Sequence, residues 1–183
     1  MASLSAIARR ALVLVVLCLA QGAWAQPVPE TSVKAALLYK FASYVEWPAE
    51  AFASPDAPFV IGVIGADELA GELEQLVRSR TINSRRILVR RVKEGEALAG
   101  IHMLFVGGRD LARIRGVSQA ARPLSVLIVT DTERGLEAGG VINFVPVEDR
   151  VGFEISVEAA ERSALRVSSR MLGVARRVLG AAS

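Results

Sequence analysis

The sequence predicts a three-layer α/β/α sandwich, with a mixed, mostly parallel sheet of about six strands and a C-terminal antiparallel hairpin followed by a long helix. Three observations favour this class. Strand-like and helix-like segments alternate over residues 59–130, which is typical of parallel strands joined by crossover helices. The strand segments are continuous apolar runs, as expected for strands buried on both faces. Two strand-like segments separated by a short turn then follow directly, which predicts the hairpin.

The N-terminus has the pattern of a cleavable secretory signal. Residues 9 and 10, both arginine, precede an apolar run at residues 11–20, and Ala23-Trp24-Ala25 fits the small-x-small cleavage rule. The apolar run is too short for a retained anchor, which needs about 20 residues. We therefore expect residues 1–25 to be removed and the mature chain to be exported in soluble form, beginning at Gln26.

Composition excludes several classes of protein. The chain has 22 Lys and Arg against 19 Asp and Glu, and two of the arginines would leave with the signal. Such balanced charge is unlike the basic surface of a nucleic-acid-binding protein, so no nucleic-acid partner is predicted. The only cysteine, Cys18, lies in the signal, so the mature chain would have no disulfide and no thiol. Residues 26–183 suffice for a single domain held by its own core.

The elements can be assigned in order along the mature chain. Thr31 is expected to cap a first helix, which ends before Trp47-Pro48 because the residue preceding proline disfavours helical angles. The segments that follow are a strand at 59–64, a helix at 67–80, a strand at 87–92, a short helix at 94–99, a strand at 101–106, a helix at 110–121 and a strand at 125–130. This alternation gives the parallel part of the sheet.

The last third of the chain changes pattern. Strands at 141–147 and 151–155 flank the turn Glu148-Asp149-Arg150. Pro146 has no N–H for a strand ladder, so this part of the sheet is expected at an edge or a bulge. Ser156 is expected to cap the long final helix. The inward face of that helix is apolar and comprises Ala160, Ala164, Val167, Met171, Leu172, Ala175, Val178 and Leu179.

Residues that carry catalytic chemistry are few. The carboxyl edge of the sheet, where ligands usually bind in this fold class, offers acids near glycines, but Asp67 and Asp110 also stand where helix caps belong. His102 is the sole histidine and falls within a predicted strand, which favours a packed or hydrogen-bonded side chain over a metal ligand. Glu148 and Asp149 lie in a turn, where local hydrogen bonding is the alternative to general acid/base chemistry. The sequence therefore predicts no enzyme, no cofactor and no metal site.

Two features favour binding to another protein. Tyr44 and Trp47 end an aromatic cluster on the first helix, and amphipathic aromatics of this kind are typical interface anchors, although core packing is the alternative. A stripe at four-residue spacing also marks the predicted final helix. It comprises Glu158, Arg162, Arg166 and Arg170. Three stacked arginines repel one another slightly, which an acidic partner would relieve, whereas a solvated helix face is the alternative.

The two ends of the mature chain resemble a known family. The stretch VKAALLYKFASYVEWP (residues 33–48) is similar to the opening motif of the YfiR/HmsC-like family, K-A-A-[FY]-[LI]-[YL]-x-F-x-x-[FY]-[VT]-x-W-P. Residues 150–156, RVGFEIS, resemble its R-[VL]-x-F-[ED]-[IV]-N, and residues 165–172, LRVSSRML, its L-x-[IL]-S-S-x-[LM]-L. The resemblance extends over essentially the whole mature chain.

The resemblance implies a non-catalytic periplasmic regulator. Proteins of this family bind the periplasmic part of an inner-membrane diguanylate cyclase of the YfiN type and hold it inactive. An outer-membrane lipoprotein of the YfiB type sequesters the repressor, whereupon cyclic di-GMP and biofilm output rise. The family also implies a homodimer. Many relatives carry cysteines that this mature chain lacks, so their redox control is not expected here.

A partner-binding surface is predicted around the hairpin and the final helix. Glu154 alternates with the inward-facing Phe153 and Ile155 and should point outward. Arg162 and Arg166 would extend this charged surface, and Phe144 would provide either an apolar anchor or core packing. Together with Tyr44 and Trp47, these are the candidate partner-binding residues. The alternative function is a periplasmic sensor module that binds a small ligand at the carboxyl edge of the sheet and signals to another membrane protein.

Overall fold

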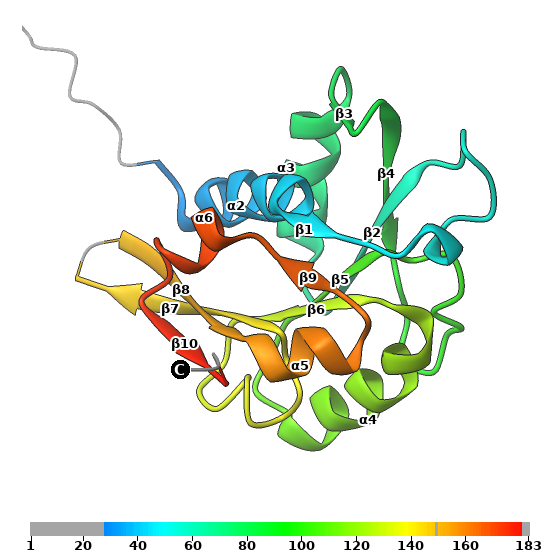
Figure 1. Ribbon diagram of the computed structural model, residues 1–183. Coiled ribbons are helices and arrows are strands. Elements are labelled where there is room, and N and C mark those ends of the chain that lie inside the picture. Colours follow the sequence, from blue (N-terminus) through cyan, green and yellow to red (C-terminus); the bar gives the residue numbers. More distant parts are fainter. Residues whose placement is uncertain (1–27, 149, 181–183) are drawn as a thin grey trace, which may run out of the picture.

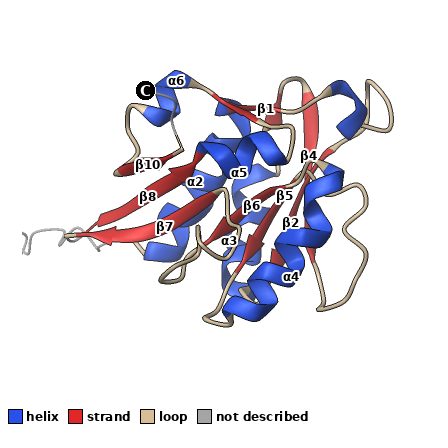
Figure 2. Ribbon diagram, turned by 60° about the horizontal axis from the view of Figure 1, so that its bottom comes forward, coloured by secondary structure: helices blue, strands red, loops and turns tan. Residues whose placement is uncertain are grey.

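The computed structural model describes residues 28–148 and 150–180; the predicted signal peptide and its cleavage site lie outside this range. The main strands are β2 (Phe59–Ile64), β3 (Thr81–Ile82), β4 (Arg85–Arg91), β5 (Met103–Val106), β6 (Leu127–Thr130), β7 (Ile142–Val147), β8 (Arg150–Ser156) and β10 (Arg177–Leu179). They form one sheet in the order β10-β8-β7-β6-β5-β2-β4-β3 (Figures 1 and 2). All six predicted strands form, and the short edge strands β3 and β10 raise the number to eight.

The pairing is mostly parallel, as predicted. Only the hairpin β7–β8 and the edge pair β3–β4 are antiparallel within this sheet. Helices α2 (Glu30–Tyr44) and α3 (Asp67–Val77) cover one face, and α4 (Leu111–Ala121) covers the other (Figure 1). The chain is therefore an α/β sandwich with an apolar core on each side of the sheet. No helix within the described residues is long and apolar enough to cross a membrane.

The first helix begins two residues earlier than the sequence predicts. Its N-cap is Pro29 rather than Thr31, because a proline φ of −55° suits a helix start and its missing N–H is not needed there. Thr31 lies inside the first turn, and its hydroxyl donates to Glu68 of α3 at 3.4 Å. The helix ends at Tyr44, before Trp47-Pro48, as predicted.

The predicted short helix at residues 94–99 is not formed. The chain makes a turn there instead, with the Glu96 N–H donating to the Lys93 carbonyl and Gly95 at a φ of +76°. The Glu96 carboxylate folds back to accept from the Lys93 N–H at 2.9 Å. A local side-chain bond thus replaces the first helical hydrogen bonds.

The predicted long final helix is wrong. Ser156 caps a helix as expected, through its Oγ and the Ala159 N–H, but this helix, α5, covers only Val157–Arg162. The remaining segment divides into strand β9 (Arg166–Val167), the short helix α6 (Ser169–Leu172) and strand β10. Strand β9 pairs with β1 (Val45–Glu46), which lies beyond the end of α2.

The position of Pro146 follows from the register of the hairpin. Strand β6 pairs with β7 only as far as Thr130↔Asn143, while β7 pairs with β8 up to Val147↔Arg150. Pro146 therefore has a neighbouring strand on one side only, as predicted for an edge. The end of the hairpin extends past the rest of the sheet (Figure 1).

Candidate functional site

The pairing of β1 with β9 creates a groove that is lined by residues from an early and a late part of the chain. We call it the Trp47 groove; its volume is about 510 Å³, and it is lined by Glu46, Trp47, Pro48, Glu161, Ala164, Leu165 and Arg166. Two predicted partner-binding residues, Trp47 and Arg166, thus lie at one surface although they are far apart in sequence. The register sets Glu46 directly opposite Arg166.

Trp47 is both a structural and a surface residue. Its ring packs against the Phe59 ring in a T-shaped arrangement, at a centroid distance of 4.9 Å and an interplanar angle of 84°. Its Nε1–H donates to the main-chain carbonyl of His102 at 3.0 Å. The side chain is half-buried, so these contacts fix the orientation in which its remaining surface faces the groove.

Tyr44 does not line the Trp47 groove. Its side chain is half-buried and packs against the core on the α2 side of the sheet. Its main-chain carbonyl accepts from the Ser168 N–H at 2.9 Å, which helps to hold the segment after β9 against the end of α2. The structure therefore separates the two aromatic candidates, Tyr44 supporting the fold and Trp47 lining the groove.

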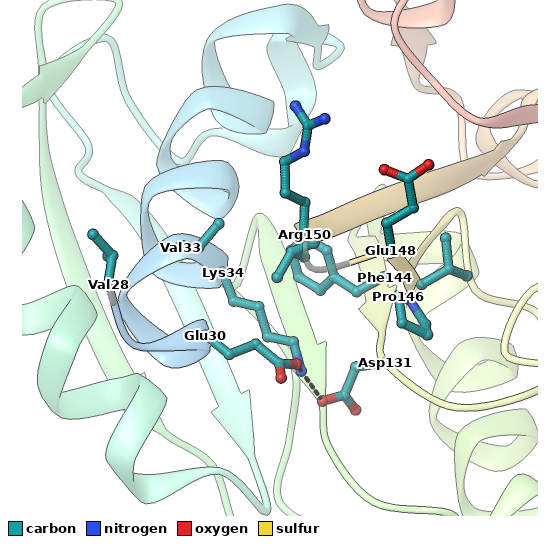
Figure 3. Close-up of a pocket in the computed structure, with 11 residues that line it drawn as sticks. Val28, Glu30, Val33, Lys34, Asp131, Phe144, Pro146, Glu148 and Arg150 are labelled. Carbon is teal, nitrogen blue, oxygen red and sulfur yellow. Dashed lines mark hydrogen bonds and ion pairs between the residues drawn. The ribbon is translucent and has the colours of Figure 1, made fainter. Parts of the chain in front are cut away.

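A second, larger pocket lies between α2 and the hairpin (Figure 3). This α2–hairpin pocket has a volume of about 830 Å³ and is lined by Val28, Glu30, Val33, Lys34, Asp131, Phe144, Val145, Pro146, Glu148, Arg150 and Val151. Phe144, another candidate, lies in its wall but is only 4% exposed. The Phe144 ring stacks on Phe41 at 5.6 Å, so its principal contacts are in the core.

Lys34 is the central charged group of the α2–hairpin pocket. It reaches from α2 toward Asp131 at the carboxyl end of β6 (Figure 3), and its Nζ lies 2.8 Å from both Asp131 and Glu30. Burial alone would lower the pKa of Lys34, but the hydrogen bonds to the two carboxylates raise it above its ordinary value. No sequence pattern indicates this contact, because Lys34 and Asp131 lie far apart in the chain.

Glu154 points away from the core, as predicted, but its carboxylate is already paired. Arg177 of the neighbouring strand β10 donates to it through Nε at 3.0 Å and Nη2 at 2.8 Å. This bidentate contact raises the pKa of Arg177. Glu154 therefore joins the last strand to the hairpin rather than presenting a free acid.

The arginine stripe is not continuous. Arg162 lies on α5 and pairs with Glu158 one turn earlier, whereas Arg166 lies on β9 and Arg170 on α6. Arg162 and Arg166 are both exposed. Within residues 28–148 and 150–180, Arg166 has no ion-pair partner, so its guanidinium is available at the rim of the Trp47 groove.

The acids at the carboxyl edge have different local roles. Asp110 caps α4, as predicted, by accepting from the N–H groups of Ala112 and Arg113. Asp67 is not a cap: it is the first residue of α3, and the N-cap is Ala66. Among the described residues, no group of three or more His, Cys, Asp or Glu side chains is arranged to hold a metal ion.

These features define an α/β domain whose two hollowed surfaces lie beside its hairpin and its β1–β9 pair. A sequence model of YfiR/HmsC-like proteins matches residues 31–176, a range that includes the whole Trp47 groove and all of the α2–hairpin pocket except Val28 and Glu30. The chain belongs to the YfiR/HmsC-like family. The comparison with curated proteins found no match.

Proposed function

We propose that this protein is a periplasmic regulator that binds and represses an inner-membrane diguanylate cyclase of the YfiN type. Membership of the YfiR/HmsC-like family over residues 31–176 is the observation that supports it. Repression works by preferential binding to the inactive state of the cyclase, because a partner shifts an equilibrium only by its difference in affinity for the two states. The protein reaches the periplasm through its cleaved signal peptide, and it acts without catalysis of its own.

The Trp47 groove is the surface that we propose for the cyclase. It combines an oriented indole with the exposed Arg166 guanidinium, which has no ion-pair partner in the part of the chain that the structure describes. Aromatic and arginine side chains are the residue types that contribute most to protein interfaces. The match to the family also includes every residue that lines the groove. A lipoprotein of the YfiB type would relieve repression by competing for the regulator, and the regulator acts as a homodimer.

Deletion of the gene tests the function directly. Cyclic di-GMP should rise in the deletion strain and return to its original level when the wild-type gene is restored. A flat level of cyclic di-GMP, in a strain that encodes candidate cyclases, would overturn the repressor function. Capture of membrane proteins with the mature domain as bait then identifies the cyclase, and light scattering on the same domain reports the homodimer.

The α2–hairpin pocket favours a second candidate function, a sensor of a small ligand. The pocket lies at the carboxyl end of β6, where open α/β sheets usually bind ligands, and it joins apolar walls to the Lys34–Asp131 pair. A ligand bound there would contact the hairpin directly. Thermal shift measurements against periplasmic metabolites test this function, and Lys34→Met should abolish any shift that arises at this pocket.

A further inference from the structure

The only histidine of the chain occupies an enclosed aromatic site. His102 is 3% exposed and stacks on Phe52 at a centroid distance of 4.4 Å and an angle of 18°. Phe59 of β2 also packs against the imidazole, at a centroid distance of 5.2 Å and an angle of 27°. The imidazole thus attaches the segment that leads into β2 to the start of β5. We call this segment, residues 47–58, the Trp47–Pro58 segment.

Both ring nitrogens of His102 are used, and together they fix one protonation state. Nδ1 accepts from the Val60 N–H at 3.0 Å, so it carries no proton. Nε2 therefore bears the proton of the neutral ring and donates it to the Ala51 carbonyl at 3.1 Å. Its main-chain carbonyl in turn accepts from the Trp47 indole. The neutral imidazole thus makes two contacts between the sheet and the Trp47–Pro58 segment, the Phe52 stack and the Ala51 bond, and the main chain of the same residue makes a third, to Trp47.

We propose that His102 is a pH-sensitive latch, which holds the Trp47–Pro58 segment closed while neutral and releases it on protonation. With a proton on Nδ1, two N–H donors, that of Val60 and that of the ring, would face each other with no acceptor between them. The buried bond would be lost, and an unpaired charge would remain in an apolar site, which is costly. The least costly relief is outward movement of the segment, because the elements below the ring are sheet strands. This latch is a property of the domain alone and does not depend on the proposed function.

The groups around the ring support a neutral state. Arg85 of β4 lies over the Phe52 ring at 3.9 Å and donates to the Ser54 and Ala57 carbonyls. It therefore brings a positive charge to the same aromatic site as the imidazole. Strand β2 presents Phe59 and the Val60 N–H to the ring, and Leu127 of β6 bonds only to the main-chain carbonyl of His102; all three residues are uncharged. The acids of the segment, at positions 50 and 56, are exposed, and within the described residues neither contacts the ring.

Burial is the largest effect and lowers the pKa of His102; the bond to Ala51 opposes it, and the charge of Arg85 lowers the pKa further by a smaller amount. In the released segment the ring would titrate near its ordinary pKa of about 6.5. The released state therefore binds more protons than the closed state below that pH. The closed state loses stability as the pH falls from about 6.5 to the lower pKa of the closed form, and loses no more below it. At neutral pH the latch is closed.

The test uses untagged mature protein, in which every imidazole signal comes from His102. Nuclear magnetic resonance follows the ring titration, and hydrogen exchange corrected for intrinsic rates follows the amides of residues 47–58 and of Val60. Between the two pKa values the open population should rise about tenfold per pH unit. Amides of α4 should keep their protection. His102→Gln retains a donor for the Ala51 carbonyl but does not titrate, so its exchange should not show this dependence on pH.

Three outcomes would overturn the latch. The first is a ring that titrates at its ordinary pKa while exchange in residues 47–58 stays constant. The second is an equal loss of protection in α4, which would mean that the whole domain opens. The third is the same dependence on pH in His102→Gln. If that variant does not fold, the first two measurements on the wild-type protein still decide.

Discussion

The indole Nε1–H of Trp47 donates a hydrogen bond of 3.0 Å to the main-chain carbonyl of His102. This bond links the chain after α2 to the strand at the centre of the sheet. The Trp47 ring also packs against Phe59 in a T-shaped arrangement, so one side chain connects the groove surface to the core beneath it. A residue predicted from sequence as an interface anchor is thus also part of the scaffold that orients the groove.

Substitution of Trp47 should therefore affect both the stability of the domain and binding at the groove. Two variants separate the contribution of the hydrogen bond to stability from that of the packed ring. Trp47→Phe keeps a ring against Phe59 and removes the hydrogen bond, which costs about 1 kcal/mol. Trp47→Ala also removes the packed ring and should cost about 3 kcal/mol. Chemical denaturation measures both values. Both proteins should remain folded, since domains of this kind have about 5–15 kcal/mol of stability. A Trp47→Phe protein as stable as wild type would mean that the bond does not form in solution.

The loop between β6 and β7 should be intolerant of a side chain at Gly135. An added Cβ would lie less than 3.0 Å from Thr130 Oγ1 and Asn143 Oδ1, which bond each other at 2.7 Å and are buried. Asn143 Oδ1 also accepts from the Thr132 N–H. Gly135→Ala should therefore cost about 2–3 kcal/mol in the free energy of unfolding. Thermal and chemical denaturation give the value.

Gly116 provides the matched control for that substitution. It lies within α4, and an added Cβ there meets no atom within 4 Å. Gly116→Ala should stabilise the protein by about 0.5–1 kcal/mol, because alanine has less conformational freedom to lose on forming a helix. Equal effects at the two glycines would show that the Thr130–Asn143 contact does not restrict Gly135.

Neutral substitutions in the Trp47 groove test its role in binding. Charge reversal is unsuitable, because Arg162→Glu would face Glu158 and Arg166→Glu would face Glu46. Arg166→Gln should change the free energy of unfolding by less than about 0.5 kcal/mol, as is usual for exposed residues, while it weakens capture of the cyclase. Quantitative capture from membranes measures the loss. Arg115→Gln, at an exposed position on α4, is the control and should capture normally.

Sequence reasoning succeeded where local patterns determine the structure. The strand at Phe59–Ile64 is apolar throughout, and the hairpin turn is marked by its polar residues, so both were predicted. The Trp47 groove could not be predicted, because it depends on the pairing of β1 with β9. Each of these strands has only two residues, and no periodic pattern marks so short an element.

The final helix was mispredicted for a specific physical reason. Residues 156–179 show helical spacing of apolar side chains, but α5 ends in a Schellman motif: the Leu165 N–H bonds to the Ala160 carbonyl, and the Ala164 N–H to that of Glu161. The left-handed position of this motif is normally glycine and here is Ala164, at a φ of +55°. The usual stop signal is therefore missing from the sequence. Burial of Leu165 and pairing of β9 with β1 compensate for the strained alanine.

Ala164→Gly distinguishes the observed end of α5 from a continuous final helix, because its effect on the free energy of unfolding has the opposite sign in the two cases. In the structure, glycine would relieve a left-handed alanine that costs about 1–2 kcal/mol, at the expense of greater freedom in the unfolded chain. The Ala164 methyl group is exposed, so its loss leaves no cavity. We expect a net gain of about 0.5–1 kcal/mol by chemical denaturation. In a continuous helix the same substitution would instead destabilise by about 1 kcal/mol. Ala120→Gly, at an exposed helical position of α4, is the control and should destabilise. If both variants lose stability, α5 continues past Ser163, and the β1–β9 pair that forms the groove is absent.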